Sequence, residues 1–406
     1  MHKTEQMKRI IVTLLMLLSA FLLAGGRNYS LDECLELAQK HGRELEQAAL
    51  SLEMSRLSYS QTGLGFLPEL SLGNTNTLSD GKHETVTSVE AGTVLFAGFG
   101  RVHAMKKARM TVETSRLELE LARRNLNAGV VELYIRLLQD KELVSICKDR
   151  LSLLEQQETL VGRKVELKAA VRSDLLAVQA DITAAKVDIL DAEGDFNASR
   201  IGLCELLEID DWRDFDVEMT DSVFPHPQSD MYSLNDLPQV HLAGIRSDIA
   251  NCEMEIAKSA VWPSVQFNVG MSSAGYRFSS YLSLSVDVPV LSLFSHAKNV
   301  REKQLSCSIA RSVESQTVES LDKELKTAVS DLENVYDKYQ LLLTEQERYE
   351  QVLADVRQKY EYGAATYFEC QSAMSGLFQA QSQLLQIKYE YLLGQRLLEI
   401  LFDAGK

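Results

Sequence analysis

The chain has 406 residues, of which 45% are hydrophobic, and it carries a formal net charge of −16 at pH 7. This acidity, without any stripe of Lys and Arg, excludes a nucleic-acid-binding protein, because phosphate contacts need clustered cations. The six cysteines lie far apart and form no CxxC pair, so we expect buried filler side chains and no metal or redox site.

The N-terminus, residues 1–26, is typical of a secretory signal peptide. Two basic residues precede an apolar run, Ile10–Leu23, which is too short for a membrane-spanning helix of about 20 residues. Small residues follow this run and predict cleavage after Gly26. A compact signal also begins at Met7, so either methionine is a compatible translation start.

The positions of the six prolines predict long helices. Residues 69–224 and 290–406 contain none, and an internal proline would break a helix. The prolines are Pro68, Pro225, Pro227, Pro238, Pro263 and Pro289.

One pattern occurs twice along the chain. The stretch GFLPELSLGN (65–74) and the stretch AVWPSVQFNVG (260–270) both follow a polar helical run and lead into alternating apolar and polar residues. Such self-similarity indicates an internal repeat. We predict a first repeat at 27–208 and a second at 233–406, joined by an acidic linker or equatorial segment at 209–232.

Each repeat opens with a helical run, Ser30–Gln61 or Ser233–Ser259. In the first of these, Ser30 is a predicted N-cap that forms a capping box with Glu33.

A β-hairpin is predicted after each opening run, at 66–96 and at 263–290. The strands are predicted at 66–78, 85–96, 263–272 and 279–290, and in the second hairpin they have one apolar and one polar face. A polar face is compatible with the wet side of a soluble sheet, but strands of about 9–11 residues favour an outer-membrane barrel. Four strands cannot close a barrel, so several chains would pool their strands.

Two heptad-patterned rods follow the hairpins, from Arg101 to about Lys168 and from about Ser295 to Tyr360. Each rod ends in a turn, with predicted tips near 168–174 and 360–370, and a helix returns to about Leu207 or Phe402. Ser173 and Thr366 are the predicted N-caps of these returning helices.

With its elements in this order twice over, the sequence resembles the TolC family of outer-membrane efflux proteins. The resemblance is carried by SLDECLELAQKHGRELEQAALSLEMSRLSYSQTGLGFLPELSLG near the start, by the paired LPEL and WPSV segments, and by the two tips. It implies a mainly α fold with a small β part. In that fold the duplicated antiparallel helical hairpins form an α-barrel, and four strands per chain contribute to a trimeric transmembrane β-barrel.

The resemblance also implies a function and partners. The protein is expected in the cell outer membrane, extending into the periplasm, as a passive exit duct of a tripartite efflux or type I secretion system. Its partners would be two further copies of the chain, a periplasmic adaptor, an inner-membrane transporter and outer-membrane lipid. No cofactor is expected.

At the periplasmic tip the resemblance implies a gate. Glu369 stands where an acidic ring is expected, whereas Ser372 replaces the acidic residue of a second ring. Tyr360 and Asp174 match a pair that hydrogen-bonds across the tip. Simpler explanations are seam packing for Tyr360, a favourable helix-start charge for Asp174 and plain solvation for Glu369. The predicted tip residues are Tyr360, Asp174, Glu369, Gly363, Thr366 and Ser173.

Two further groups of residues are predicted around the strands. Pro68 and Pro263 would fix the bend from helix into membrane strand. An aromatic belt at the membrane interface, or ordinary sheet packing, would explain Trp262, Tyr276, Phe278 and Tyr281.

An enzyme is not expected, because the sequence has no GxSxG, HExxH or phosphate-loop motif. The alternative function is that of a soluble periplasmic coiled-coil adaptor or structural envelope protein. The alternating strands and the presence of two repeats argue against it.

Overall fold

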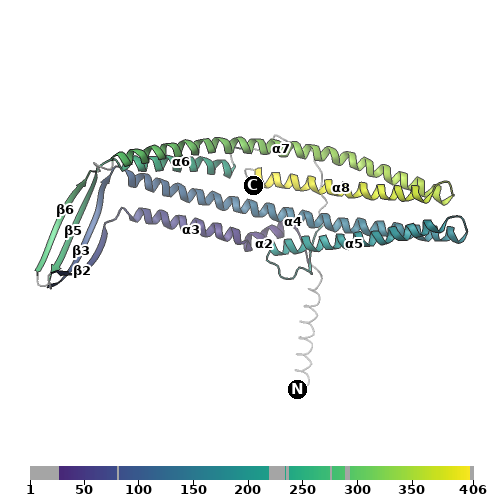
Figure 1. Cartoon of the computed structure of the whole chain (residues 1–406), viewed down its shortest axis with the longest axis horizontal. Coiled ribbons are helices and arrows are strands. Elements are labelled where there is room, and N and C mark those ends of the chain that lie inside the picture. The colour runs from purple at the N-terminus through teal and green to yellow at the C-terminus, as the bar shows by residue number, and fades with distance from the viewer. Residues whose placement is uncertain are drawn as a thin grey trace, which may run out of the picture. The chain divides into compact units, whose positions relative to one another are not determined.

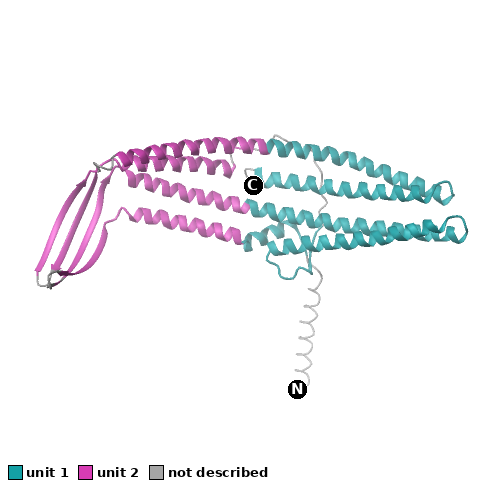
Figure 2. Cartoon of the chain, viewed as in Figure 1, with its two compact units in different colours: residues 1–42, 124–232, 325–403 teal, residues 43–123, 233–324, 404–406 magenta. Residues whose placement is uncertain are grey.

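A computed structural model describes residues 27–79, 82–218, 234, 237–274, 277–288 and 293–402. The predicted signal peptide therefore lies outside the described residues. The chain divides into two compact units, shown in Figure 2. Unit 1 takes residues 1–42, 124–232 and 325–403, and unit 2 takes residues 43–123, 233–324 and 404–406. Each unit thus draws on both halves of the sequence.

The first helical run is broken at Gly42 into α2 (Leu31–His41) and α3 (Arg43–Leu64). The predicted capping box is confirmed, since Glu33 N donates to Ser30 Oγ and Ser30 N donates to the Glu33 carboxylate. A Cβ atom at Gly42 would lie 2.7 Å from the Ala38 carbonyl oxygen and from a Leu126 methyl. These close neighbours leave no room for a side chain, so glycine is required at the position where the predicted single helix is interrupted.

Long helices account for most of the chain (Figure 1). The two predicted rods are confirmed as unbroken helices, α4 (Gly100–Glu166) and α7 (Leu293–Glu361), each of which contributes to both units. The returning helices are α5 (Arg172–Leu206) and α8 (Tyr367–Phe402), and α6 (Pro238–Ser259) begins at a proline. None of the described helices is both long and apolar enough to cross a membrane.

A four-stranded antiparallel sheet in unit 2 joins the two predicted β-hairpins. Its order is β2-β3-β5-β6, so β3 and β5 pair the first hairpin with the second, and β2 and β6 are the outer strands. The strand bounds are Glu69–Ser79 for β2, Lys82–Ala97 for β3, Ser264–Ala274 for β5 and Arg277–Asp287 for β6. β2 begins later than predicted because a turn after α3 occupies residues 65–67.

The register of the sheet separates an apolar face from a polar face. Val269 pairs with Leu282 and with Ala91, whereas Asn268 pairs with Ser283 and with Gly92 on the other face. The apolar face is exposed in the single chain: Leu72 is 79% and Leu282 is 71% accessible. In water, exposing an apolar face of this kind is unfavourable unless another apolar surface packs against it, and no element of the described chain does so.

A second, two-stranded sheet in unit 1 was not predicted. β1 (Arg27–Tyr29) pairs in parallel with β4 (Phe215–Val217), and the rings of Tyr29 and Phe215 stack at 4.8 Å. The Tyr134 hydroxyl lies 3.3 Å from the Tyr29 carbonyl oxygen and 3.0 Å from that of Glu218, so it closes the end of this sheet. Part of the predicted linker is therefore a strand, and three residues are too few to show a period-two pattern.

All six cysteines are buried and unpaired, as the sequence predicts. Burial is the main cause that raises the pKa of the Cys34 thiol to about 12 and that of Cys204 to about 11. Cys34 and Cys204 are therefore protonated, and all six side chains act as small buried fillers.

Replacing Tyr134 by Phe is expected to loosen the β1–β4 sheet, because two carbonyl oxygens lose their hydroxyl donor. A loss of about 1 kcal/mol corresponds to roughly fivefold faster amide exchange in 27–29 and 215–217, measured by hydrogen–deuterium exchange. Tyr362→Phe is the matched control, since Tyr362 is 81% exposed. Equal exchange in the two variants would contradict the role given to the Tyr134 hydroxyl.

Candidate functional site

The two hairpin tips lie at the same end of unit 1 (Figure 1) and use one type of turn. After α7, Gly363 has φ +77°, and Ala364 N donates to the Lys359 carbonyl. After α4, Lys168 has φ +59°, and Ala169 N donates to the Lys164 carbonyl. Gly363, a predicted tip residue, therefore supplies the left-handed residue that ends a helix, and Lys168 occupies the equivalent place in the first tip.

Glu369 and Thr366 form a capping box at the start of α8. Glu369 N donates to Thr366 Oγ1 at 3.3 Å, and the Glu369 carboxylate accepts from Thr366 N at 2.7 Å. The backbone and side-chain hydrogen bonds from Thr366 lower the pKa of the Glu369 carboxyl. The predicted N-cap role of Thr366 is confirmed, and Glu369 carries an exposed negative charge at the tip.

The predicted N-cap role of Ser173 is wrong. α5 begins at Arg172, two residues earlier than an N-cap at Ser173 requires, and its N-cap Val171 makes no side-chain capping bond. The turn ends with backbone bonds instead, since Asp174 N donates to the Val171 carbonyl. The hydroxyl of Ser173 therefore lies inside the first turn of the helix and not before it.

Tyr360 is buried at the tip but does not form the predicted hydrogen bond with Asp174. Within the described residues its hydroxyl has no hydrogen-bond partner, and its pKa is raised by burial and then by the charge of Asp174. The Lys164 ammonium lies 4.1 Å from the centre of the Tyr360 ring and donates to the Tyr360 carbonyl oxygen. Tyr360 is thus held by packing and by Lys164, which supports the simpler seam-packing explanation.

A hydrogen-bond cluster centred on Asp181 connects the two hairpins and was missed from the sequence. The Tyr367 hydroxyl donates to Asp181 Oδ2 at 2.9 Å, and Gln371 Nε2 lies 2.8 and 3.0 Å from the two carboxylate oxygens. The partners are separated by 186 and 190 residues, so no local pattern reveals them. From the sequence alone, only the spacing of Tyr367 and Gln371, which places them one helical turn apart on the same face, could be recognised.

The Asp181 cluster borders an apolar core between the hairpins. Tyr367 is 5% exposed and belongs to this core with Tyr360. Burial, followed by the Asp181 hydrogen bond and charge, raises the pKa of the Tyr367 hydroxyl far above its usual range. Tyr367 is therefore a permanent donor at physiological pH. The other buried members of the core are Leu154, Val161, Val178, Ile182 and Ala185.

The residues predicted around the membrane strands do not form one belt. Phe278 lies on the apolar face of β6, but Tyr281 lies on the polar face, where its ring covers Gly270 and its hydroxyl hydrogen-bonds Glu90. Strand alternation separates them, because their positions differ by three. Trp262 is exposed beside the Gly98 turn, and Tyr276 lies outside the described residues.

The two predicted bend prolines stand directly before strands. Pro68 precedes β2, which begins at Glu69, and Pro263 precedes β5, which begins at Ser264. A proline has no N–H to donate to a ladder, so the first position outside a strand suits it.

Comparison with known proteins gives the family. Residues 34–207 and 233–400 match the sequence profile described as Outer membrane efflux protein. The chain belongs to the outer membrane efflux protein family. The predicted TolC-family resemblance is thereby confirmed. Family membership also confirms that the protein lies in the outer membrane, as predicted. It likewise confirms the prediction that the protein acts in efflux and is not an enzyme.

Individual relatives are distant in sequence and similar in fold. The Cation efflux system protein CusC of Escherichia coli (strain K12) is 22% identical over 413 residues, covering 90% of this chain and 85% of that protein. A crystal structure of CusC superposes with a TM-score of 0.84 at 17% identity, covering 92% of each chain. The outer membrane protein VceC of Vibrio cholerae gives 0.83 at 14% identity, covering 91% and 95%. The fold of this outer membrane efflux protein is therefore that of known outer-membrane channels.

The capping box predicts different results for two hydroxyl residues at the tips. Thr366→Ala is expected to destabilise the first turn of α8 by about 1 kcal/mol, giving roughly fivefold faster amide exchange in 367–370. Ser173→Ala is the matched control and is expected to leave exchange at the start of α5 unchanged. Equal effects of both variants would show that neither hydroxyl acts as a specific cap.

Proposed function

We propose that three copies of this chain form the outer-membrane exit duct of a tripartite efflux or type I secretion system. In this proposal the strands form the membrane barrel, and the helices form a hollow α-barrel in the periplasm. An inner-membrane transporter and a periplasmic adaptor deliver substrates, which pass through the duct passively. Two repeats, 27–208 and 233–406, supply near-equivalent parts to the tube.

The observation that carries the proposal is the uncovered sheet of unit 2. Its apolar face is exposed, and its outer strands β2 and β6 have no neighbour within the described chain. In lipid, backbone groups at an open edge have no water to bond, so only a closed barrel satisfies them. Placing β6 of one copy against β2 of the next supplies that closure.

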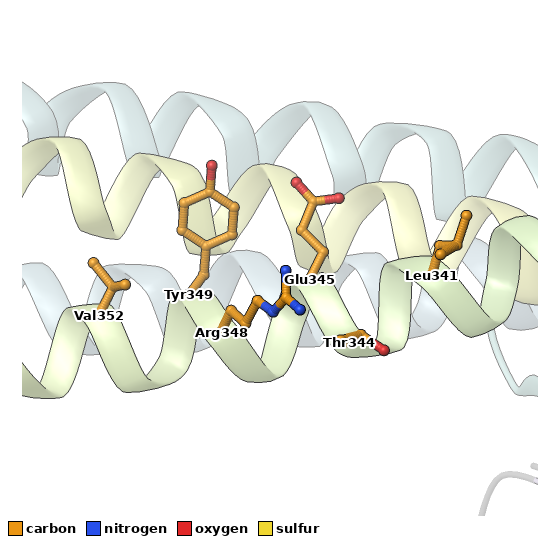
Figure 3. Close-up of a pocket in the computed structure, with 6 residues that line it drawn as sticks. All are labelled: Leu341, Thr344, Glu345, Arg348, Tyr349 and Val352. Atoms are coloured by element: carbon orange, nitrogen blue, oxygen red, sulfur yellow. The ribbon is translucent and has the colours of Figure 1, made fainter.

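The helical part of unit 1 offers a matching pair of surfaces for assembly. On α5 an apolar stripe faces solvent, and Leu190 in it is 68% exposed. On α7 a shallow hollow is lined by residues of that helix alone, as Figure 3 shows. Residues repeating at three and four positions form seams between helices. The α5 stripe comprises Leu176, Val187, Leu190 and Ile201, and the α7 hollow comprises Leu341, Thr344, Glu345, Arg348, Tyr349 and Val352.

A head-to-tail contact between these two surfaces suits a closed ring. Because α5 and α7 differ, the contact is heterologous, and a heterologous contact repeats around a rotation axis. Arg348 in the α7 hollow is available to pair with Asp191 or Asp195 on the exposed side of α5, although Glu345 of the same hollow has the same sign as these two carboxylates. We therefore assign the α5 stripe and the α7 hollow to the surface between copies.

The tips would form the periplasmic constriction of such a duct. Three copies of the exposed Glu369 carboxylate would make one acidic ring, as the family resemblance implies, and rings of charge decide which solutes pass a pore. Tyr360 and Thr366 would contribute by shaping the turn that presents Glu369.

Native mass and conductance test the proposal directly. Protein extracted in detergent from purified outer membranes is expected to have about three times the mass of one mature chain, and to form ion-conducting pores in planar lipid bilayers. Heat-denatured protein from the same preparation is the control for contaminating pores. A monomer that remains soluble without detergent would overturn the duct and favour the adaptor alternative.

Leu190→Glu is expected to prevent assembly, because a carboxylate would be buried between copies without a partner. Native mass spectrometry should show at least a tenfold loss of trimer, which corresponds to about 1.4 kcal/mol. Ser152→Glu, which introduces the same group at an exposed position of α4, is expected to assemble normally. Trimer formation by Leu190→Glu at the level of the control would remove α5 from the interface.

A further inference from the structure

A β-bulge near the end of β3 turns an aromatic ring towards the apolar face of the sheet. The bulge lies between Val94 and Phe96, and it pairs Phe96 with Val265, whose side chain belongs to the apolar face. Without the bulge, strand alternation would place Phe96 on the polar face together with Val94. The apolar face therefore gains a phenylalanine at the edge where the sheet meets the helices of unit 2.

Phe99 extends this aromatic surface beyond the end of β3. Its backbone is left-handed, with φ +65°, which is costly for a bulky residue and is found mostly where a side chain has a functional role. The rings of Phe96 and Phe99 meet edge to face, with 5.5 Å between their centres. Phe99 is nevertheless 66% exposed, and Trp262, which borders the same turn at Gly98, is 63% exposed. The strained turn thus holds large apolar rings outside the core of the single chain.

The exposed face of α4 changes from apolar to basic as the helix leaves this turn. Val102, Lys106 and Arg109 are spaced by four and three residues, so they share one face, and all three are exposed. At 1.5 Å per residue, Lys106 lies about 10 Å along the helix axis beyond Phe99. No acidic residue occurs in α4 before Glu113, although the chain has a net charge of −16.

The two cations of this face differ from their neighbour Lys107. The Lys107 ammonium is paired with Glu253 of α6 at 2.6 Å, whereas Lys106 and Arg109 form no ion pair within the described part of the chain. A long basic side chain beside an apolar surface suits a lipid interface, because its aliphatic stem contacts apolar groups while its charge reaches a phosphate. Basic residues at a membrane surface also attract anionic lipids.

We propose that the turn at Phe96 and Phe99 and the basic face of α4 bind phospholipid of the periplasmic leaflet of the outer membrane, with a preference for anionic headgroups. The rings contact the lipid at the level of its glycerol groups, and Lys106 and Arg109 contact the headgroup phosphates. Continuity identifies the occupant, since the apolar face that the proposed barrel places in lipid continues into the ring of Phe96. This inference rests on the proposed duct and adds the class of lipid that its periplasmic rim selects.

Quenching of tryptophan fluorescence by labelled lipids tests the contact. The chain has two tryptophans, so Trp212→Phe leaves Trp262 as the only emitter of the protein reconstituted in phosphatidylcholine vesicles. Trp262 is expected to be quenched more by lipid with a nitroxide near the headgroup than by lipid with a nitroxide at the end of the acyl chain. Trp262→Phe, which leaves Trp212 in unit 1, is the matched control and should be quenched by neither lipid.

A reporter on the turn itself tests the class of lipid. In the background that lacks both native tryptophans, Phe99→Trp is expected to show roughly tenfold stronger binding of brominated phosphatidylglycerol than of brominated phosphatidylcholine in vesicles that mix the two lipids. Adding Lys106→Gln and Arg109→Gln is expected to abolish this preference. Arg172→Gln with Lys186→Gln removes two exposed cations of α5 in unit 1 and should preserve it.

The outcomes distinguish this inference from the proposed duct. Leu282→Trp, in the same background, places an emitter on the apolar face of the sheet, where lipid labelled at the end of the acyl chain should quench it. Quenching there, without quenching of Trp262 or of Phe99→Trp, would overturn the inference and assign the turn to the lumen or to a contact between copies. Equal binding of the two lipids, or a preference that survives Lys106→Gln with Arg109→Gln, would also overturn it. No quenching of Leu282→Trp would contradict the proposed barrel, and this inference would fall with it.

Discussion

The unpaired edges of the β2-β3-β5-β6 sheet are the constraint on which the rest of the molecule depends. Every backbone N–H and C=O group on an outer strand needs a partner, and an exposed apolar face needs cover. One chain supplies neither for this sheet. The duplication of the sequence provides the first part of the answer, since two hairpins pair through β3 and β5 and leave only two edges per chain. In the proposed duct, outer-membrane lipid supplies the cover for the apolar face.

Unit 1 is held together by a different kind of interaction. Its hairpins meet through buried aromatic and aliphatic side chains, and polar contacts at Asp181, Lys164 and Glu142 surround this core. Apolar burial favours contact without fixing its register, whereas hydrogen bonds fix the register and add little net stability. The combination explains how long, smooth helices are kept from sliding along one another.

The sequence predicts elements well where a physical rule acts locally. Proline-free heptad runs predict α4 and α7 nearly to the residue, and alternation predicts the strands that follow Pro68 and Pro263. The capping box at Ser30 is equally local, because its partners are three residues apart. The requirement for glycine at position 42 is not local, since one of the neighbours that exclude a side chain there is Leu126 of another helix.

The candidate site was predictable only in part, for the same reason. Thr366 and Glu369 interact within one turn and were found, whereas Asp181 binds residues nearly two hundred positions away. Tyr360 and Asp174 were paired by resemblance alone. In the structure, Tyr360 is packed in the apolar core and its hydroxyl makes no hydrogen bond with Asp174. The face of Tyr281 was local information, because alternation within β6 places it opposite Leu282 without reference to another strand.

The six buried thiols have a consequence for how this protein reaches its mature form. An exported outer-membrane protein passes through a compartment in which cysteine pairs become oxidised. Once folded, these side chains are buried and therefore shielded from reagents. Before folding nothing protects them. The chain is thus in a kinetic competition during export, in which the helices must bury their sulfur atoms faster than catalysts of disulfide formation can join them wrongly.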